Sequence, residues 1–251
     1  MDRKWIVVTG ASSGIGYATT TKLIKEGYAV VATSKDKDKL NSIFNLEIEK
    51  GNVITVPWDL SDIDSLKTYS KEVNGRVGKI SGLVHCAGNQ KILPVHMINK
   101  DKLLEVFNIN TFAAICLASA FAKKNMYVPS KTSFIFISSI SAHSGVTGNT
   151  IYASSKGAIE GFVTGSAAEF AKRGIRINSV APGRVRTPMV ENFMETLPEE
   201  ARKLSMDEYP LGWGEPEDVA SIIEFLLNDR SRWLTGQNYI IDGGHLSRDS
   251  H

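Results

Sequence analysis

The chain has 251 residues, 42% of them hydrophobic, and its 29 basic and 27 acidic side chains leave a net charge of +2. This composition excludes a wholly disordered chain, and the charge balance gives no electrostatic footprint for nucleic acid or for an anionic membrane. No run is expected to reach the roughly 20 apolar residues of a membrane helix, and the first residues show no signal peptide, so we expect a cytoplasmic protein. Cys86 and Cys116 lie far apart and the five histidines lack ligand spacing, so neither a disulfide framework nor a metal site is predicted.

Short apolar runs alternate with longer amphipathic segments along the whole chain. Continuously apolar runs are typical of strands buried on both faces, and this alternation predicts a doubly wound α/β fold, with a mostly parallel seven-stranded sheet covered by helices on both faces. The predicted strands are Trp5–Thr9, Ala29–Thr33, Val53–Pro57, Gly82–His85, Ser133–Ser138, Arg176–Val180 and Asn238–Ile241. The predicted helices are Gly16–Gly27, Ile63–Val77, Leu103–Lys124, Tyr152–Arg173 and Glu217–Asn228. Nothing divides the chain, so we expect one domain over residues 1–251.

One long irregular stretch, residues 187–215, separates the sixth strand from the last helix. Segments of this length inside a compact domain are usually functional, often as a lid over a site. A surface helical insertion is the other interpretation, and the sequence does not separate the two.

The first strand runs into a glycine-rich turn, TGASSGIG at residues 9–16, and a helix follows. Glycine permits the tight turn and lets backbone N–H groups approach a pyrophosphate, while the helix N-terminus offers unpaired N–H groups. A glycine-rich turn without a ligand is the alternative, but the position directly between strand and helix favours dinucleotide binding. The predicted cradle residues are Gly10, Ser12, Ser13, Gly14, Ile15 and Gly16.

Two later strand ends fit the same ligand. After the third strand, the Asp59 carboxylate of the pair Asp59-Leu60 could accept from an adenine amino group. After the fourth, Ala87 and Gly88 are small enough for the backbone to run close to a ribose. A helix cap at Asp59 and a plain turn at Ala87 are the alternatives. The ends of parallel strands face one crevice, so these positions support one another.

The end of the second strand should determine which cofactor binds. Many NAD enzymes place a carboxylate there to hold the ribose 2′-hydroxyl, but this chain has Ser34 followed by Lys35. A hydroxyl and a cation suit a 2′-phosphate, whereas an acid would repel it. The alternative is a solvated charged loop. We therefore predict NADP(H) rather than NAD(H).

The candidate catalytic group begins with Tyr152 and Lys156, which share a helix face at i and i+4. A free tyrosine titrates near pH 10 and is a poor acid or base at neutrality, but a nearby ammonium lowers its pKa. Ser139, at the end of the fifth strand, could donate a hydrogen bond to a substrate oxygen. A Tyr–Lys pair alone is common on helices; with this serine and the cradle it predicts proton transfer.

At this point the chain resembles the short-chain dehydrogenase/reductase family over its whole length. The matching motifs are TGASSGIG at 9–16, Asp59-Leu60, Ala87-Gly88, Asn110, Ser139, Tyr152–Lys156, Pro182–Thr187, Leu234–Gln237 and Ile241–Gly244. The resemblance implies a Rossmann-type fold and an oxidoreductase that transfers a hydride between a nicotinamide cofactor and a small-molecule carbonyl or secondary alcohol.

The resemblance also implies roles for single residues. Tyr152 would be the general acid in reduction and the base in oxidation, and Lys156 would lower its pKa and hold the nicotinamide ribose. Ser139 would polarise the carbonyl. Asn110 would hold, through its backbone, a water that links Lys156 to solvent. The segment after the sixth strand would also hold cofactor, through Pro182, Gly183, Val185 and Thr187, the last two at the carboxamide.

Two departures from the family pattern stand out. The family often has Asn-Asn-Ala-Gly after the fourth strand, where this chain has His85-Cys86-Ala87-Gly88. Acyl-carrier reductases of the family often have arginine at the position of Ser13, which weakens the NADP(H) prediction. Within the family, the whole sequence nevertheless most resembles bacterial 3-oxoacyl-(acyl-carrier-protein) reductases. A sugar, polyol or secondary-metabolite ketone is the alternative substrate, and a non-catalytic dinucleotide-binding sensor or scaffold is the alternative function.

The two longest predicted helices, Leu103–Lys124 and Tyr152–Arg173, have apolar residues on more than one face. A helix that covers one sheet face needs only one apolar stripe, and surplus apolar surface usually marks an interface. Close packing within the subunit is the alternative. Family members pair these helices across a two-fold axis, and a second axis near the last strand would complete a homotetramer.

Overall fold

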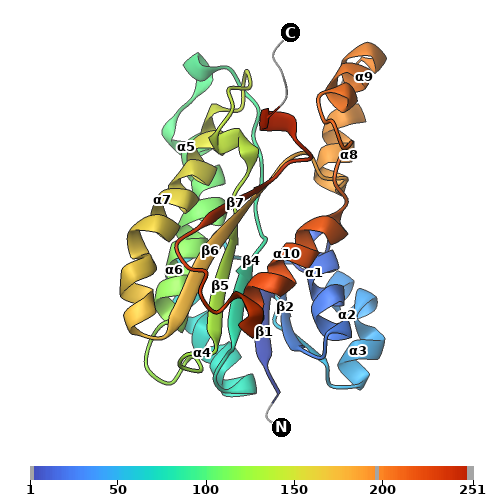
Figure 1. Ribbon diagram of the computed structural model, residues 1–251. Helices are drawn as coiled ribbons and strands as arrows, with labels where there is room; N and C mark the ends of the chain where they lie inside the picture. The colour runs from blue at the N-terminus through green and yellow to red at the C-terminus, as the bar shows by residue number, and fades with distance from the viewer. Residues whose placement is uncertain (1–2, 196–197, 248–251) are drawn as a thin grey trace.

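Seven strands form one parallel sheet, as predicted, and their order is β3-β2-β1-β4-β5-β6-β7 (Figure 1). The computed structural model describes residues 3–195 and 198–247. The strands are β1 Trp5–Thr9, β2 Ala29–Thr33, β3 Val53–Thr55, β4 Gly82–His85, β5 Thr132–Ile137, β6 Ile175–Pro182 and β7 Asn238–Ile241. Strand order reverses between β1 and β4, and in such sheets ligands bind at that reversal, beyond the carboxyl ends of the strands.

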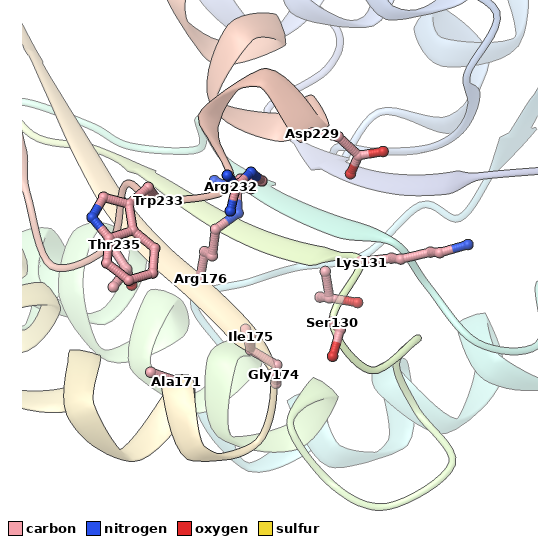
Figure 2. A pocket seen from close by; sticks show the side chains of 11 residues that line it. Ser130, Lys131, Ala171, Gly174, Ile175, Arg176, Asp229, Arg232, Trp233 and Thr235 are labelled. Atoms are coloured by element: carbon pink, nitrogen blue, oxygen red, sulfur yellow. The ribbon is translucent and has the colours of Figure 1, made fainter.

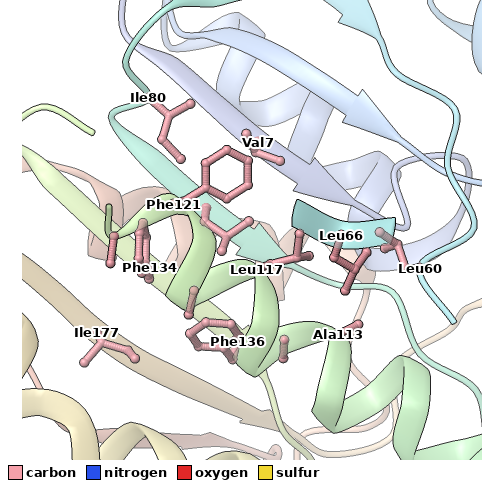
Figure 3. Packing of buried hydrophobic residues seen from close by; sticks show 14 of the residues in the cluster. Val7, Leu60, Leu66, Ile80, Ala113, Leu117, Phe121, Phe134, Phe136 and Ile177 are labelled. Atoms are coloured by element: carbon pink, nitrogen blue, oxygen red, sulfur yellow. The ribbon is translucent and has the colours of Figure 1, made fainter. Parts of the chain in front are cut away.

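Helices cover both faces of the sheet. They are α1 Gly14–Lys25, α2 Lys37–Ile43, α3 Asn45–Glu49, α4 Leu66–Val77, α5 Lys100–Phe107, α6 Ala113–Phe121, α7 Thr150–Lys172, α8 Pro188–Glu195, α9 Glu199–Asp207 and α10 Pro216–Leu227. Helices α4, α6 and α7 pack one buried cluster against the sheet, where Leu117 and Phe121 of α6 meet Phe134 of β5 (Figure 3). Helices α1, α2 and α10 pack the other cluster. Every residue of β2, β4 and β5 is buried, which explains their unbroken apolar runs.

Some predicted boundaries were wrong. The third strand ends at Thr55 rather than Pro57; proline has no N–H for the sheet ladder. The short charged helices α2 and α3 were not predicted. The predicted helix over Leu103–Lys124 is instead α5 and α6 joined by a π-helical turn at Asn108–Phe112. A π turn inserts residues into the helical repeat without changing the apolar pattern enough to be seen.

The run Lys100–Phe121 is long and apolar enough to cross a membrane by length and composition alone, with a mean hydropathy of 1.5 over its most apolar stretch. Its first turns nevertheless contain Lys100, Asp101, Lys102 and Glu105, so it is not an unbroken apolar run of roughly 20 residues. The core accounts for the composition, because Val106, Leu117 and Phe121 are fully buried within the protein.

The stretch 187–215 contains two helices, α8 and α9, beside the carboxyl end of the sheet (Figure 1). Thr196 and Leu197, between the helices, lie outside the described residues. The stretch is therefore helical for most of its length, and its possible role as a lid depends on what it contacts.

Candidate active site

The glycine-rich turn lies at the carboxyl end of β1, where the strand order reverses. Gly10 has a φ of +65°, and a Cβ there would lie 2.8 Å from the backbone nitrogen of Ala87. A Cβ on Gly16 would overlap the carbonyl oxygen of Gly10. Both glycines are therefore required by close backbone packing: Gly10 lets the β1 and β4 ends approach each other, and Gly16 lets α1 pack against the turn.

The N-terminus of α1 is left open to a ligand. Ser13 occupies the N-cap position in an extended conformation, but its side chain makes no cap hydrogen bond, and the first turn of α1 has no acidic residue. The first N–H groups of a helix need partners and favour an anion. The cradle thus fits a pyrophosphate, which would take the place of a capping side chain.

Two neighbouring cavities share Tyr152 in their linings. The first, of ≈ 170 Å³, is lined by Gly10, Ser13, Gly14, Ile15, Gly16, Cys86, Ala87, Gly88, Ile137, Tyr152, Lys156, Thr187, Pro188 and Met189. It joins the cradle to the Tyr–Lys pair, and its lining comes from the ends of β1, β4 and β5, from α7 and from the start of α8. The second, of ≈ 190 Å³, is lined by Tyr152 and Ser139, by residues of the 140–149 loop, and by residues of α8 and the C-terminal segment. Met189 of α8 also lines both cavities.

Burial raises the pKa of Tyr152, and a hydrogen bond between Tyr152 and Ser139 opposes that rise in part. The resemblance implied that Lys156 lowers this pKa; the net shift in the free protein is upward because burial is the larger effect. The Lys156 ammonium lies over the ring face, 5.5 Å from the centroid, and donates a hydrogen bond to the Ile137 carbonyl at 2.8 Å. It is not directed at the phenol oxygen.

Lys156 itself is almost fully buried, and desolvation lowers its pKa to about 8. Its Nζ lies beside Gly88, where a Cβ would approach Nζ to 3.5 Å and Asn110 Oδ1 to 3.0 Å. The glycine at this strand end therefore leaves room for the Asn110 side chain and for Lys156, which lines the first cavity.

Asn110 is fully buried within the π turn, and its side chain joins three segments. Its Oδ1 accepts from the Asn89 N–H at 2.9 Å, and its Nδ2 donates to the Asn89 carbonyl at 3.0 Å and to Ser155 Oγ at 3.0 Å. Ser155 precedes Lys156 on α7. The amide thereby ties the β4 exit to the helix of the Tyr–Lys pair, while π turns of this kind occur often at functional sites.

His85, at a position where the family often has asparagine, connects β4 to β1 and to the π turn. Burial lowers its pKa to about 4, so the ring is neutral. Nε2 lies 2.9 Å from the Ile109 carbonyl and donates to it, and Nδ1, 3.0 Å from Thr9 Oγ1, accepts from that hydroxyl. Thr9 Oγ1 accepts in turn from the Ala87 N–H. The chain of bonds joins β1, β4 and the π turn.

At the end of β2, Lys35 Nζ forms an exposed ion pair with Asp59 at 2.9 Å. Asp59 also accepts from the N–H and hydroxyl of Ser61 in a local turn, whereas Asp62 holds the N-cap position of the next helix, so Asp59 is not the helix cap weighed as its alternative role. Asp36 caps α2 by accepting from the Lys39 N–H. The carboxylate of Asp36, the nearest acid after Ser34, therefore caps α2 and does not lie at the end of β2.

Several predicted cofactor residues lie outside the first cavity. Leu60 and Val185 have side chains buried in the core, so only their backbones could meet a ligand. Gly183 lines the second cavity. The remaining predicted residues that line neither cavity are Ser12, Ser34, Lys35, Asp59 and Pro182.

The sequence did not point to the far wall of the second cavity, where Tyr209 and His245 stack with ring centroids 4.5 Å apart. No local motif marks them, because the fold alone brings the end of α9 to the C-terminal segment. The loop 143–149 contributes Ser144, Val146 and Asn149 to this cavity.

A larger cavity, of ≈ 470 Å³, lies elsewhere, by the amino end of β6 (Figure 2). Arg176, Arg232 and the exposed Trp233 line it. Of the residues that the motifs single out, it contains Thr235 but none of the candidate catalytic or cofactor-binding residues, so size alone does not mark the active site. Over the described ranges, no group of three or more His, Cys, Asp and Glu side chains could hold a metal ion.

The family model described as Enoyl-(Acyl carrier protein) reductase matches residues 10–245. The chain belongs to the short-chain dehydrogenase/reductase family. It is 36% identical to 3-oxoacyl-(acyl-carrier-protein) reductase FabG of Thermotoga maritima, over 97% of this chain and 98% of that protein. It is 32% identical to carbonyl reductase family member 4 of Xenopus laevis, over 96% and 97%. This protein is therefore an oxidoreductase of that family.

Solved structures of the family superpose along the whole chain. One is described as ElxO with NADP bound, with a TM-score of 0.86, 27% identity, and coverage of 98% of this chain and 100% of that chain. Another is a short-chain dehydrogenase/reductase from Serratia marcescens, with a TM-score of 0.87, 26% identity, and coverage of 96% and 97%. The likeness confirms the predicted Rossmann-type fold.

Proposed function

We propose that this protein is an NADP(H)-preferring carbonyl reductase whose first cavity takes the cofactor and whose second takes the substrate. The observation that carries the proposal is that Tyr152 lines both cavities. A proton donor at that junction lies where a carbonyl would meet the nicotinamide ring. A non-catalytic sensor would have no need of such a group beside two cavities.

Each group of the site then has a chemical role. The bound nicotinamide would supply the hydride that the carbonyl carbon accepts. Tyr152 gives its phenolic proton to the carbonyl oxygen, and burial keeps that phenol protonated at neutral pH. Ser139 donates a hydrogen bond to the same oxygen, where negative charge develops. Lys156 supplies positive charge beside the tyrosine and holds the ribose hydroxyls; Asn110 fixes α7 and, through its backbone, holds the water that leads to solvent.

The cofactor preference rests on the end of β2. Ser34 and Lys35 offer a hydroxyl and a cation to a 2′-phosphate, and Asp36 is held away as a helix cap. Lys35 would exchange its exposed ion pair with Asp59 for the phosphate at small cost, because such pairs contribute only about 0–1 kcal/mol. Asp59 would then be released toward the adenine.

The substrate we propose is a 3-oxoacyl thioester. Support comes from the 36% identity to a 3-oxoacyl-(acyl-carrier-protein) reductase and from apolar side chains that line the second cavity, among them Ile92, Val146 and Phe193. Helix α8 would act as a lid, since its residues Pro188 and Met189 line the first cavity and Val190 lines the second.

The assay is oxidation of NADPH and of NADH by the purified protein with acetoacetyl-CoA, a hexose, a polyol-derived ketone and a cyclic ketone. The proposal predicts the highest kcat/KM for acetoacetyl-CoA with NADPH. Turnover of another ketone but not of acetoacetyl-CoA would overturn the substrate assignment, while the assignment as a carbonyl reductase would stand. Binding of NADPH without turnover of any ketone would support a sensor instead.

We also propose a homotetramer in the cytoplasm. On α7, Gly157, Gly161 and Gly165 recur every fourth residue, and a Cβ on any of them would meet nothing within 4 Å. Phe112, beside this helix, is 39% exposed. This flat face and its exposed ring suit close packing on a second copy, and the exposed Ile240 of the edge strand β7 suits a second two-fold interface.

A further inference from the structure

We propose that Glu160 is a positioning residue for the proposed reductase reaction, which holds the loop of Ser139 against α7. Glu160 lies on α7 one turn beyond Lys156, and its side chain is 11% exposed. None of the motifs that identify the active site includes it. Its carboxylate faces the start of the loop and not either cavity.

Two donors from the loop converge on one oxygen of this carboxylate. Ser138 Oγ donates to Glu160 Oε1 at 2.7 Å, and His143 Nε2 lies 3.0 Å from the same oxygen. The Nε2–H of the neutral tautomer and of the charged ring both donate to it, so the contact does not depend on the protonation state of His143. Ser138 also lies 3.2 Å from the Lys156 carbonyl.

These two donors bracket Ser139. Ser138 immediately precedes it, and His143 follows it after one short 3₁₀ turn, Ile140–Ala142. Within the turn, Ser139 Oγ accepts from the Ser141 N–H at 3.1 Å, and the same hydroxyl hydrogen-bonds Tyr152. Glu160 therefore clamps both ends of the segment that aims the Ser139 hydroxyl at the phenol.

A carboxylate is a costly choice for this place if packing alone is required. Its helix neighbours Ile159 and Val163 are buried in the core, and an apolar side chain would cover the sheet without desolvating a charge. Burying an ionised group is tolerated when hydrogen bonds compensate it, and such groups can fix one conformation rather than add stability. Here the conformation fixed is that of the Ser139 loop.

The test compares Glu160→Leu, Glu160→Gln and the control Glu169→Leu, which alters an acid on the same helix with a 79% exposed side chain. For Glu160→Leu we expect kcat to fall roughly 10- to 100-fold, as small misplacements of reacting groups do, with Tm not lowered and the Kd of NADPH within about twofold of wild type. Glu160→Gln keeps an acceptor oxygen and should retain most of kcat. The control should match wild type.

Unchanged kcat in Glu160→Leu, or a loss of activity explained by a matching loss of folded protein, would overturn the proposal. A second measurement separates it from the proposed function. Hydrogen exchange of the Ser141, Ala142 and His143 amides, all bonded within the turn, should quicken in Glu160→Leu but not in Glu169→Leu. If wild type turns over no ketone, the reductase proposal fails, and the exchange rates still decide whether Glu160 holds the loop; equal rates would reject it.

Discussion

The ammonium of Lys156 lies over the face of the Tyr152 ring, 5.5 Å from its centroid, and its hydrogen bond goes to the Ile137 carbonyl. The lysine is therefore held at the cofactor cavity by the backbone of β5, and the phenol proton is retained by burial. The two groups occupy the same cavity without a direct bond. Because the two groups are separate, the roles of Lys156 and Tyr152 can be tested independently.

The first prediction concerns the pH dependence of cofactor binding. The pKa of Lys156 in the free protein is lowered to about 8, so the ammonium that should hold the ribose is lost as pH rises through about 8. The Kd of NADPH should therefore rise above about pH 8. Fluorescence titration at pH values from roughly 6.5 to 9.5 measures it on both sides of this pKa. In Lys156→Ala, Kd should be higher throughout and kcat lower. A selective loss of kcat in this variant, with Kd unchanged, would reject the contact with the ribose.

The second prediction concerns cofactor choice. Ser34→Asp places a carboxylate at the end of β2, where it repels a 2′-phosphate and accepts from a 2′-hydroxyl. We expect the ratio of kcat/KM for NADPH to that for NADH to fall at least about tenfold, which corresponds to about 1.4 kcal/mol. Ser34→Asn is the matched control without the charge. A wild-type protein that already prefers NADH would contradict the interpretation of Ser34 and Lys35.

The third prediction concerns His85 and acid stability. The ring is neutral when folded, with a pKa of about 4, against about 6.5 in an unfolded chain. Between those pH values the unfolded state binds the extra proton, so His85 makes the free energy of unfolding fall as pH drops from about 6.5 to 4, by on the order of 3 kcal/mol at most.

Urea denaturation at several pH values and fixed protein concentration measures this effect. His85→Gln, which can still donate and accept, should show a shallower loss of stability over that range than wild type. Parallel curves for the two proteins would show that His85 does not carry this part of the acid sensitivity.

The fourth prediction concerns assembly. Light scattering at micromolar concentration should give about four times the chain mass of 27.5 kDa. Gly161→Glu, which sets a charged side chain on the flat face of α7, should reduce the mass and leave the fold intact, because nothing within the subunit lies near its Cβ. A wild-type monomer that persists as concentration rises would contradict the tetramer. A stable dimer would support only one of the two proposed interfaces.

The sequence predicted the strands of the sheet and the glycine-rich cradle because short stretches of sequence identify both. Continuously apolar runs locate the strands, and glycines between β1 and α1 locate the cradle. Other features have no such signal. The π turn around Asn110 leaves the apolar spacing nearly unchanged, and Tyr209 and His245 meet only through the tertiary fold. The pKa of Tyr152 depends on burial, which the i, i+4 spacing to Lys156 does not reveal.

The most direct test of the central claim, that Tyr152 transfers the proton at the junction of the two cavities, is the kcat of Tyr152→Phe with NADPH and the best ketone, measured beside the Kd of NADPH. Phenylalanine keeps the ring that lines both cavities and removes only the phenolic oxygen. We predict a fall in kcat of about 10²- to 10⁴-fold with Kd nearly unchanged. A variant that keeps more than about a tenth of wild-type kcat, above the range expected for loss of a general acid, would contradict the claim.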